Sequence, residues 1–235
     1  MIKIFSLLFL MFSLHGSEIY ATLNVKAEQS ANLAFDASGI VKKVNVDIAD
    51  EVKRGDVLAV LDNDDILAML ERAKTTLKFA LRDYERQLKI KHLIDAGKFD
   101  VYALKYEDAK NQLSYQQALY DKTFLRAPFD GVIFEKDIEV GDTVSGMMLK
   151  TVLKIQTPRK RKIVLEFDQK YHKSVQVGQA FKYSVNGDET VYEGVISKIY
   201  PHADSDNRKI KAEVEAKDFM VGLFGDGHIT VADKK

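Results

Sequence analysis

The chain has 235 residues, of which 46% are hydrophobic and 30% charged, and its 35 Lys and Arg balance its 35 Asp and Glu. This is an ordinary globular composition for one to three small domains, and a net charge of zero does not favour nucleic acid or an anionic membrane surface as a partner. The absence of cysteine excludes disulfides, Cys-ligated metals, thiol nucleophiles and an N-terminal lipidated Cys.

The first predicted element is an export signal over residues 1–21. Lys3 precedes an apolar run at residues 4–14, and small and polar residues follow it. The run is shorter than the roughly 20 residues that span a bilayer, so the pattern is typical of a cleaved signal peptide. The alternative is a buried N-terminal strand or helix. We expect cleavage between Gly16 and Ala21, leaving a mature chain with no transmembrane or lipid anchor.

The next element is one copy of an internal repeat. A gapless shift of 92 places residues 35–63 on a later segment, with Gly39 on Gly131 and short Val- and Ile-rich runs on each other. Such runs, bounded by Gly, Asp and Asn, are typical of short strands. One copy cannot bury its apolar face alone, so the repeat predicts a β-sandwich made of two halves. Ala49 stands where the second copy has Gly141, so we expect the two halves to turn differently there if Gly141 has a positive φ.

Between the two copies the sequence predicts an α-helical hairpin over residues 64–123. Apolar residues recur in steps of four and three, first at Ile66, Leu70, Ala73, Leu77, Ala80 or Leu81, Tyr84 and Leu88, and then at Tyr102, Tyr106, Ala109, Leu113 and Tyr120. This is the seam of two packed antiparallel helices. We expect a turn at Gly97, a first helix of about 45 Å, a shorter second helix, and Asp64 or Asp65 as the first cap. The alternative is a hairpin folded back as ordinary core.

After the hairpin, Pro128 and Gly131 mark the return to the sheet. From residue 158 to the C-terminus, alternating segments with turns at Gly178 and Asn186 predict several short strands and a small β-barrel. The basic run at residues 159–162 either contacts a partner or lipid headgroups, or is a solvated linker.

The sequence offers little reactive chemistry. Its five histidines lie far apart, at His15, His92, His172, His202 and His228, and no HxH, HExxH, P-loop, dinucleotide or GxSxG pattern occurs. We therefore predict no catalytic residue, no metal site, no cofactor and no enzyme activity. Met147 and Met148, the one Met pair, are interpreted as core or turn filling.

The two halves resemble the split lipoyl-like domain of periplasmic adaptor proteins, the HlyD-like membrane fusion proteins. "RAPFDGVI" at residues 126–133 is similar to the family signature that begins the second half, and "EVKRGDVLAVLD" at residues 51–62 resembles the segment that closes the first. The resemblance implies a mainly β fold with an inserted long α-helical hairpin: a split lipoyl-like β-sandwich at residues 22–63 plus 124–157, the hairpin, and a C-terminal small β-barrel at 158–235. A lipoyl or biotinyl carrier protein is less favoured, because "DNDD" at residues 62–65 replaces the carrier's modified Lys.

The resemblance also implies a function. It predicts a periplasmic adaptor subunit of a tripartite efflux pump, which links an inner-membrane transporter, with the RND type favoured, to an outer-membrane TolC-like channel. It predicts a homo-oligomer that associates with the inner membrane through partners and binds no nucleic acid. The alternative is an adaptor of a type I secretion or ATP-driven exporter. The membrane-proximal domain that family members often add is expected to be absent or reduced.

The hairpin tip is the predicted partner-binding site. Adaptors that meet a TolC-like channel carry R-x3-L-x6-S at the tip, and the matching positions are Lys89, Leu93 and Asp100. Leu is retained, Lys keeps the charge but not the planar fork of Arg, and Asp100 keeps the capacity to cap the second helix. Counting back from "YEDAK" instead places the Ser position at Tyr102.

Overall fold

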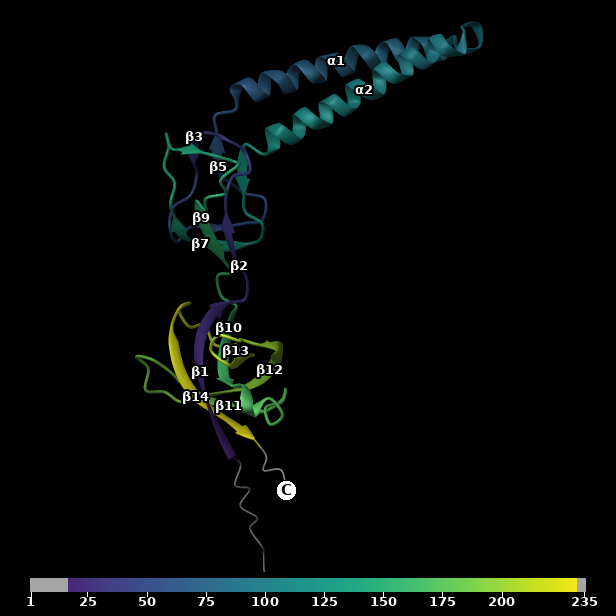
Figure 1. Ribbon diagram of the computed structural model, residues 1–235. Coiled ribbons are helices and arrows are strands. Elements are labelled where there is room, and N and C mark those ends of the chain that lie inside the picture. Colours follow the sequence, from purple (N-terminus) through teal and green to yellow (C-terminus); the bar gives the residue numbers. More distant parts are fainter. Residues whose placement is uncertain (1–16, 232–235) are drawn as a thin grey trace, which may run out of the picture. The chain divides into compact units, whose positions relative to one another are not determined.

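The computed structural model describes residues 17–231 of the chain (Figure 1). They form two compact units, residues 29–158 and residues 17–28 with 159–231. Most of the predicted export signal, up to Gly16, lies outside the described residues, whereas residues 17–21 belong to the first strand.

The unit that contains the chain's C-terminal third is a closed antiparallel β-barrel. Its strands are β1 (Ser17–Ala27), β10 (Arg161–Asp168), β13 (Lys209–Ala216), β12 (Tyr192–Ala203), β11 (Ala180–Val185) and β14 (Phe224–Val231), named in their order around the barrel. A short 3-10 helix, η2 (Gln169–Tyr171), follows β10. Alternate side chains of the strands face inward and form one apolar core that includes Phe167, Phe181 and Ile229.

Strand β1 differs from the sequence-based division, which gave residues 22–28 to the lipoyl-like domain. Leu23 of β1 pairs with Leu165 of β10 on one side and with Gly225 of β14 on the other. Alternating burial from Ile19 onward shows that one face of β1 lines the barrel core. Such alternation identifies a half-buried strand but not its partners, which here lie far along the chain. The barrel is therefore completed by a strand from the N-terminal side.

The other unit contains a two-sheet module, which we define as residues 29–63 and 123–158. One sheet has the order β2-β9-β7-β4 and the other β6-β5-β3-β8. The bounds are β2 (Ser30–Leu33), β3 (Gly39–Val44), β4 (Glu51–Val52), β5 (Val57–Leu61), β6 (Phe124–Arg126), β7 (Gly131–Lys136), β8 (Thr143–Val144) and β9 (Leu153–Gln156). Both sheets contribute to a single apolar core, with Val41 and Leu58 from one and Ile133 and Ile155 from the other.

The repeat explains this topology. The shift of 92 carries β3 onto β7 and β4 onto β8, and each sheet takes strands from both halves. The pairings are exchanged between the halves, because Gly39 lies opposite Val144 and Gly131 lies opposite Val52. Neither half can therefore complete a sheet without the other.

The loops at Ala49 and Gly141 turn in the same way, so the expected difference between them is wrong. Ala49 has φ 75° and Gly141 has φ 98°. The Ala49 N–H donates to the Ile133 carbonyl over 2.8 Å, and the Gly141 N–H donates to the equivalent Val41 carbonyl over 2.9 Å. The bond to the opposite half holds Ala49 in a left-handed state that costs a non-glycine residue about 1–2 kcal/mol.

The helical hairpin consists of α1 (Asp64–Lys89), the 3-10 turn η1 (Lys91–Leu93) and α2 (Ala96–Asp121) (Figure 1). Each α-helix has 26 residues, so the expectation of a shorter second helix is wrong. At 1.5 Å per residue each is about 39 Å long. Gly97 lies in the first turn of α2 and not in the connection between the helices. Glycine is tolerated at this place, because the first N–H groups of a helix have no partner within the helix.

The start of α1 also differs from expectation. The N-cap is Asn63, whose side chain makes no capping hydrogen bond. Asp64 and Asp65 lie in the first turn, where their negative charges stabilise the helix by interacting with the positive end of its dipole. The Asn63 side-chain amide instead donates to the Thr123 hydroxyl over 2.9 Å. Both residues are buried, so this bond joins the two chain segments at the base of the hairpin.

The predicted mainly β fold with a helical hairpin and a β-barrel is confirmed at this level. None of the helices among residues 17–231 is long and apolar enough to cross a membrane.

Candidate partner-binding site

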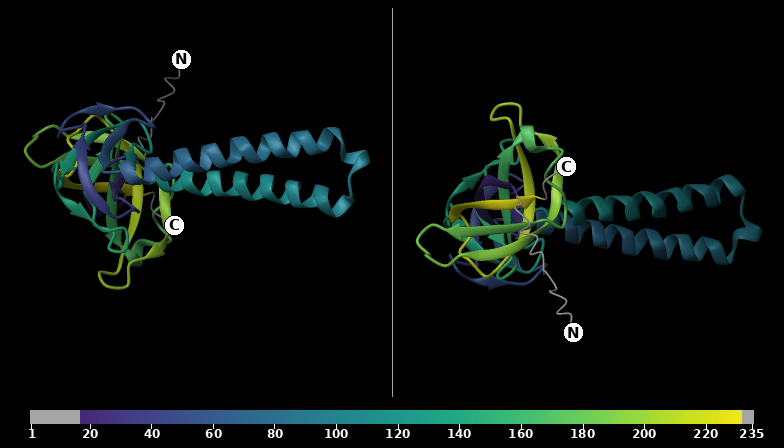
Figure 2. Two further views of the ribbon diagram at one scale, coloured as in Figure 1. Left: turned by 90° about the horizontal axis from the view of Figure 1, so that it is seen from above. Right: turned by 90° about the horizontal axis from the view of Figure 1, so that it is seen from below.

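The hairpin tip is built from the six residues between the two α-helices. Helix α1 ends at Lys89, and the Leu93 N–H donates to the Ile90 carbonyl over 2.8 Å to close η1. Ile94 is extended, and Asp95 caps α2 by accepting from the Lys98 N–H over 3.2 Å. The chain reverses direction here, and the two helices run side by side back to the two-sheet module (Figure 2).

The structure brings the three predicted tip residues to the same end of the hairpin. Lys89 is the last residue of α1, Leu93 is the last residue of η1, and Asp100 is the fifth residue of α2. All three are exposed, and Leu93 has 73% of its surface in solvent. An apolar side chain so exposed at a helix connection contributes nothing to the hairpin core, which suits a contact with another molecule.

The proposed capping role of Asp100 is wrong. Asp95 caps α2, and Asp100 lies one turn inside the helix. The prediction failed because it placed the turn at Gly97, whereas the extended backbone at Ile94 and Asp95 sets the helix start. Asp is one of the residue types preferred at an N-cap, so Asp95 was itself a start signal that sequence reasoning could have used.

An aromatic cluster packs between the two helices next to the tip. Tyr84 of α1 stacks on Tyr106 of α2 with ring centroids 5.2 Å apart and an interplanar angle of 12°, and it also contacts Phe99 at 5.6 Å. The Lys91 ammonium lies 4.5 Å from the centre of the Phe99 ring. These contacts join the two helices next to η1.

Phe99 is a residue that the sequence analysis missed. It is 7% exposed and belongs to the seam between the helices. The predicted seam of the second helix begins at Tyr102. One further step of three residues toward the N-terminus reaches Phe99 and continues the same heptad pattern. Elsewhere in the predicted seam, Leu70, Ala73 and Ala109 are buried, whereas Leu88 is 48% exposed, so its assignment to the seam is wrong.

The outer faces of the hairpin carry several large apolar side chains among their charges. Leu104 is 70% exposed, Met69 54% and Phe79 53%. Beside Phe79, the small side chains of Thr76, Ala80 and Ala109 leave a hollow of about 490 Å³ between the helices. Scattered apolar side chains are ordinary on a surface, but a two-helix rod has little core of its own, so these faces are available to partners.

The base of the hairpin is surrounded by ion pairs. The Lys42 ammonium lies 2.7 Å from Asp64 and 3.3 Å from Asp62, and Lys122 lies 3.0 Å from Asp36. The hydrogen bond to Asp64 raises the pKa of Lys42. The side chains of these pairs are between 46% and 77% exposed, so the pairs stabilise the fold little and weaken with salt.

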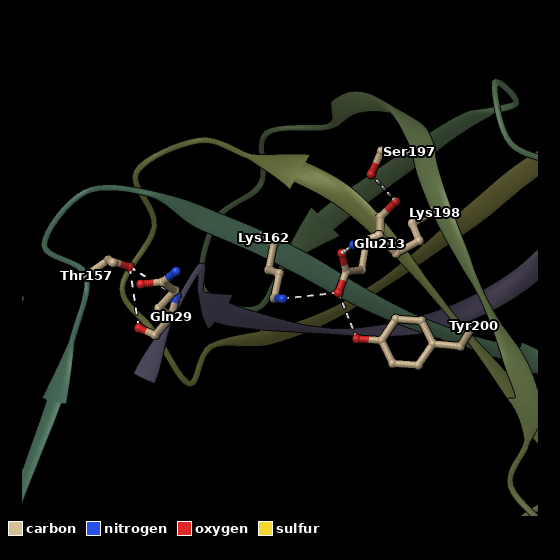
Figure 3. Close-up of polar contacts among 7 residues, drawn as sticks. All are labelled: Gln29, Thr157, Lys162, Ser197, Lys198, Tyr200 and Glu213. Carbon is tan, nitrogen blue, oxygen red and sulfur yellow. Dashed lines mark hydrogen bonds and ion pairs between the residues drawn. The ribbon is translucent and has the colours of Figure 1, made fainter. Parts of the chain in front are cut away.

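The barrel contains one strongly perturbed carboxylate, Glu213 on β13 (Figure 3). It accepts from the Lys162 and Lys198 ammonium groups over 3.1 Å each and from the Tyr200 hydroxyl over 2.7 Å. Burial alone would raise its pKa, but these hydrogen bonds outweigh burial and lower the pKa to about 2. With all its partners on neighbouring strands, Glu213 ties β10, β12 and β13 together and has the features of a structural group.

Among residues 17–231, no group of three or more His, Asp or Glu side chains is arranged to hold a metal ion. At residues 62–65, where a carrier domain has its modified Lys, the chain passes directly into α1. Met147 and Met148 are 94% and 79% exposed and lie in a turn, so they do not fill the core, and the alternative of a turn position is confirmed.

Comparison with known families and curated proteins gives consistent matches. Residues 29–155 match the family described as CzcB-like, barrel-sandwich hybrid domain. The chain is 27% identical over 147 residues to the cobalt-zinc-cadmium resistance protein CzcB of Cupriavidus metallidurans, covering 55% of this chain and 28% of that protein. It is 53% identical over 49 residues to the fatty acid resistance protein FarA of Neisseria gonorrhoeae, covering 21% of this chain and 12% of FarA. The chain thus spans between about an eighth and a quarter of these relatives.

Solved structures show the same fold. A MacA–MexA chimera that contains the α-hairpin domain of Pseudomonas aeruginosa MexA superposes with a TM-score of 0.86 at 21% identity, covering 94% of this chain and 84% of the chimera. MacA from Actinobacillus actinomycetemcomitans superposes with a TM-score of 0.78 at 19% identity, covering 94% and 80%. At these identities the likeness concerns the fold alone.

Proposed function

Since the family match covers more than half of its residues, the chain belongs to the CzcB-like membrane fusion, or periplasmic adaptor, family, and we propose that it is the adaptor subunit of a tripartite efflux pump. In this role it links an inner-membrane transporter of the RND type to an outer-membrane TolC-like channel. The single observation that carries the proposal is the hairpin, whose apex presents Leu93 with 73% of its surface exposed.

The proposed mechanism is assembly rather than catalysis. Each helix of the hairpin is about 39 Å long, so the tip can contact a partner well beyond the two-sheet module from which the hairpin emerges. We propose that the module acts as a lipoyl-like scaffold without a carrier Lys. We also propose that several copies associate, since one narrow rod buries too little surface to seal a conduit.

For the tip we propose direct contact with the channel through Lys89, Leu93 and Asp100. Leu93 supplies the apolar anchor, and the exposed Lys89 and Asp100 supply charges of opposite sign beside it. An apolar centre with a charged rim is the usual composition of a specific protein contact. Asp95 and the aromatic cluster of Tyr84, Phe99 and Tyr106 hold these residues in place without touching the channel.

We further propose that export removes the signal near Gly16. Cleavage there leaves β1 whole, whereas cleavage at Ala21 would remove residues that pair with β14, among them Ile19, which is buried in the barrel core. The mature adaptor is then periplasmic and associates with the inner membrane through its transporter.

The transported substrate is left open by this proposal. The names of the relatives refer to cobalt, zinc and cadmium in one case and to fatty acids in the other. The hairpin and the two-sheet module are concerned with assembly, so we assign them no substrate.

The test is cross-linking in cells followed by purification of the chain and identification of its partners. The wild type is expected to capture both a channel and a transporter. Leu93→Asp is expected to reduce capture of the channel by about tenfold or more, because a charge replaces the apolar anchor, while capture of the transporter is unchanged. The matched control is Met220→Asp, since Met220 is 75% exposed but lies on the barrel.

Unchanged capture of the channel by Leu93→Asp would remove the tip from the proposal. Capture of an ATP-driven transporter in place of an RND transporter would favour the alternative type of exporter. Capture of neither partner by the wild type would contradict the adaptor function itself.

A further inference from the structure

A hollow of about 610 Å³ opens on the barrel between η2 and the second half of β12. Phe167, Ile199 and Ile210 line it, and all three belong to the barrel core or pack against it. Most small-molecule sites have volumes of about 300–1,000 Å³ and an apolar lining. The hollow therefore has the size and the floor of a ligand site.

A bulge in β12 creates this opening. Ile199 lies opposite Ala212 and Ala203 lies opposite Ile210, so three residues of β12 stand against one residue of β13. Pro201, in the middle of the three, has no N–H to donate to the ladder. The regular pairing is interrupted, and the apolar floor is left open at this place instead of being covered by a continuous strand.

The charged residues that line the hollow are basic or ionisable to a cation. They are Lys170, His172 and His202, and no carboxylate is among the lining residues. Two carboxylates lie nearby. Asp168 accepts from the Lys170 N–H over 2.9 Å and its other oxygen lies 3.9 Å from the Lys170 ammonium, while Asp204 accepts from the Asp206 N–H over 2.9 Å. The pair between Lys170 and Asp168 is long and both side chains are more than half exposed, so it is weak and leaves the ammonium able to bind an anion. The opening thus combines an apolar floor with a rim of positive character.

We propose that this hollow binds an amphipathic anion, a molecule with an apolar chain and one carboxylate, such as a medium-chain fatty acid. The chain lies on Phe167, Ile199 and Ile210, where it is removed from water. The carboxylate lies at the rim and accepts charge-assisted hydrogen bonds, with Lys170 as the permanent cation. The site lies on the barrel and uses no residue of the hairpin, so its test is independent of the adaptor function.

The test is calorimetric titration of the purified chain with decanoate below its micelle concentration. We expect saturable binding of one decanoate per chain, at least about tenfold tighter than binding of decyltrimethylammonium, which has the same apolar chain and the opposite charge. Acetate, which has the carboxylate without the chain, is expected to give no measurable heat. Equal binding of the cationic and anionic amphiphiles would overturn the proposal, as would the absence of saturable decanoate binding; the latter result would favour a protein segment as the occupant.

Two variants assign the binding to the hollow. Ala203→Phe fills it and is expected to abolish decanoate binding, and Lys170→Glu reverses the rim charge and is expected to weaken binding by about tenfold. The control is Lys182→Glu, which reverses an exposed charge on β11 outside the hollow and is expected to leave binding unchanged. Lys170 is exposed, so its variant reports on binding even if Ala203→Phe perturbs folding. Unchanged affinity in Lys170→Glu, or an equal loss in Lys182→Glu, would contradict the proposal.

Discussion

The two halves of the two-sheet module share equivalent strands, β3 with β7 and β4 with β8, and the loop between them, but they differ in packing at equivalent places. Gly131 has a backbone carbonyl and the Ile155 side chain where a Cβ would stand, whereas its counterpart Gly39 has room for one. Ala49 adopts the same positive φ as Gly141 although it is not glycine. The comparison shows that the repeat preserves the strand pairing, while each half has its own local packing and its own strain.

The largest effect is expected when each glycine of the equivalent pair is replaced by alanine. A Cβ at Gly131 would lie 2.6 Å from Ile155 Cγ1 and 2.7 Å from the Gln156 carbonyl oxygen. We expect Gly131→Ala to lower the free energy of unfolding by about 3 kcal/mol, because backbone and core must both shift. The matched Gly39→Ala is expected to change the free energy of unfolding by less than about 0.5 kcal/mol, since the nearest neighbour of a Cβ at Gly39 is a Leu61 methyl carbon at 3.4 Å. Urea unfolding of both variants measures the two changes. Equal losses in the two variants would show that the halves are packed alike.

The barrel, which has no such repeat, provides the next test through Glu213. Its pKa is about 2 in the folded chain against an ordinary value of 4.5, so its stabilisation is present above about pH 4.5 and is lost as the pH falls toward 2. We expect Glu213→Gln to destabilise the barrel by about 2 kcal/mol at pH 7, because Lys162 and Lys198 lose their shared counter-charge. The difference from the wild type should nearly vanish near pH 2. Thermal melts across this pH range measure it, and a difference that is independent of pH would rule out the charge as its source.

The smallest effect concerns the two equivalent loops. We expect Ala49→Gly to stabilise the chain by about 1 kcal/mol, since it removes a left-handed alanine at some cost in chain entropy. Gly141→Ala is expected to destabilise by about 1 kcal/mol for the converse reason. Neither change meets a crowded neighbour, since nothing lies within 4 Å of a Cβ at Gly141. Urea unfolding measures the change in the free energy of unfolding of both variants. A destabilising Ala49→Gly would mean that the loop at Ala49 is not strained.

Much of the fold could be read from local patterns. The gapless repeat indicated two halves, and the heptad seam from Ile66 to Tyr84 indicated a helix packed along one stripe. The exposure of Leu93 could be expected from its position at the end of a helix. These signals are carried by neighbouring residues, and the physics that connects them to structure is local.

The remaining features could not be read in this way. Ile19 and Leu23 alternate as a strand does, but nothing local identifies β10 and β14 as the partners of β1. The cap of α2 and the buried place of Phe99 depended on where the turn begins, and Gly97 was a misleading marker because a glycine is tolerated in a first helical turn. The hollow on the barrel arises from a bulge, which is defined only relative to the neighbouring strand.

The sequence by itself determined the repeat, the hairpin and the absence of a carrier Lys, because each depends on residues that are adjacent or evenly spaced. Only the tertiary structure decided that β1 completes the barrel, that Ala49 keeps the turn of Gly141, and that Glu213 lies among two lysines and a tyrosine. The physical reason is that strand pairing, buried charge and imposed backbone strain are set by residues far apart in the chain, whose contacts exist only once the chain has folded.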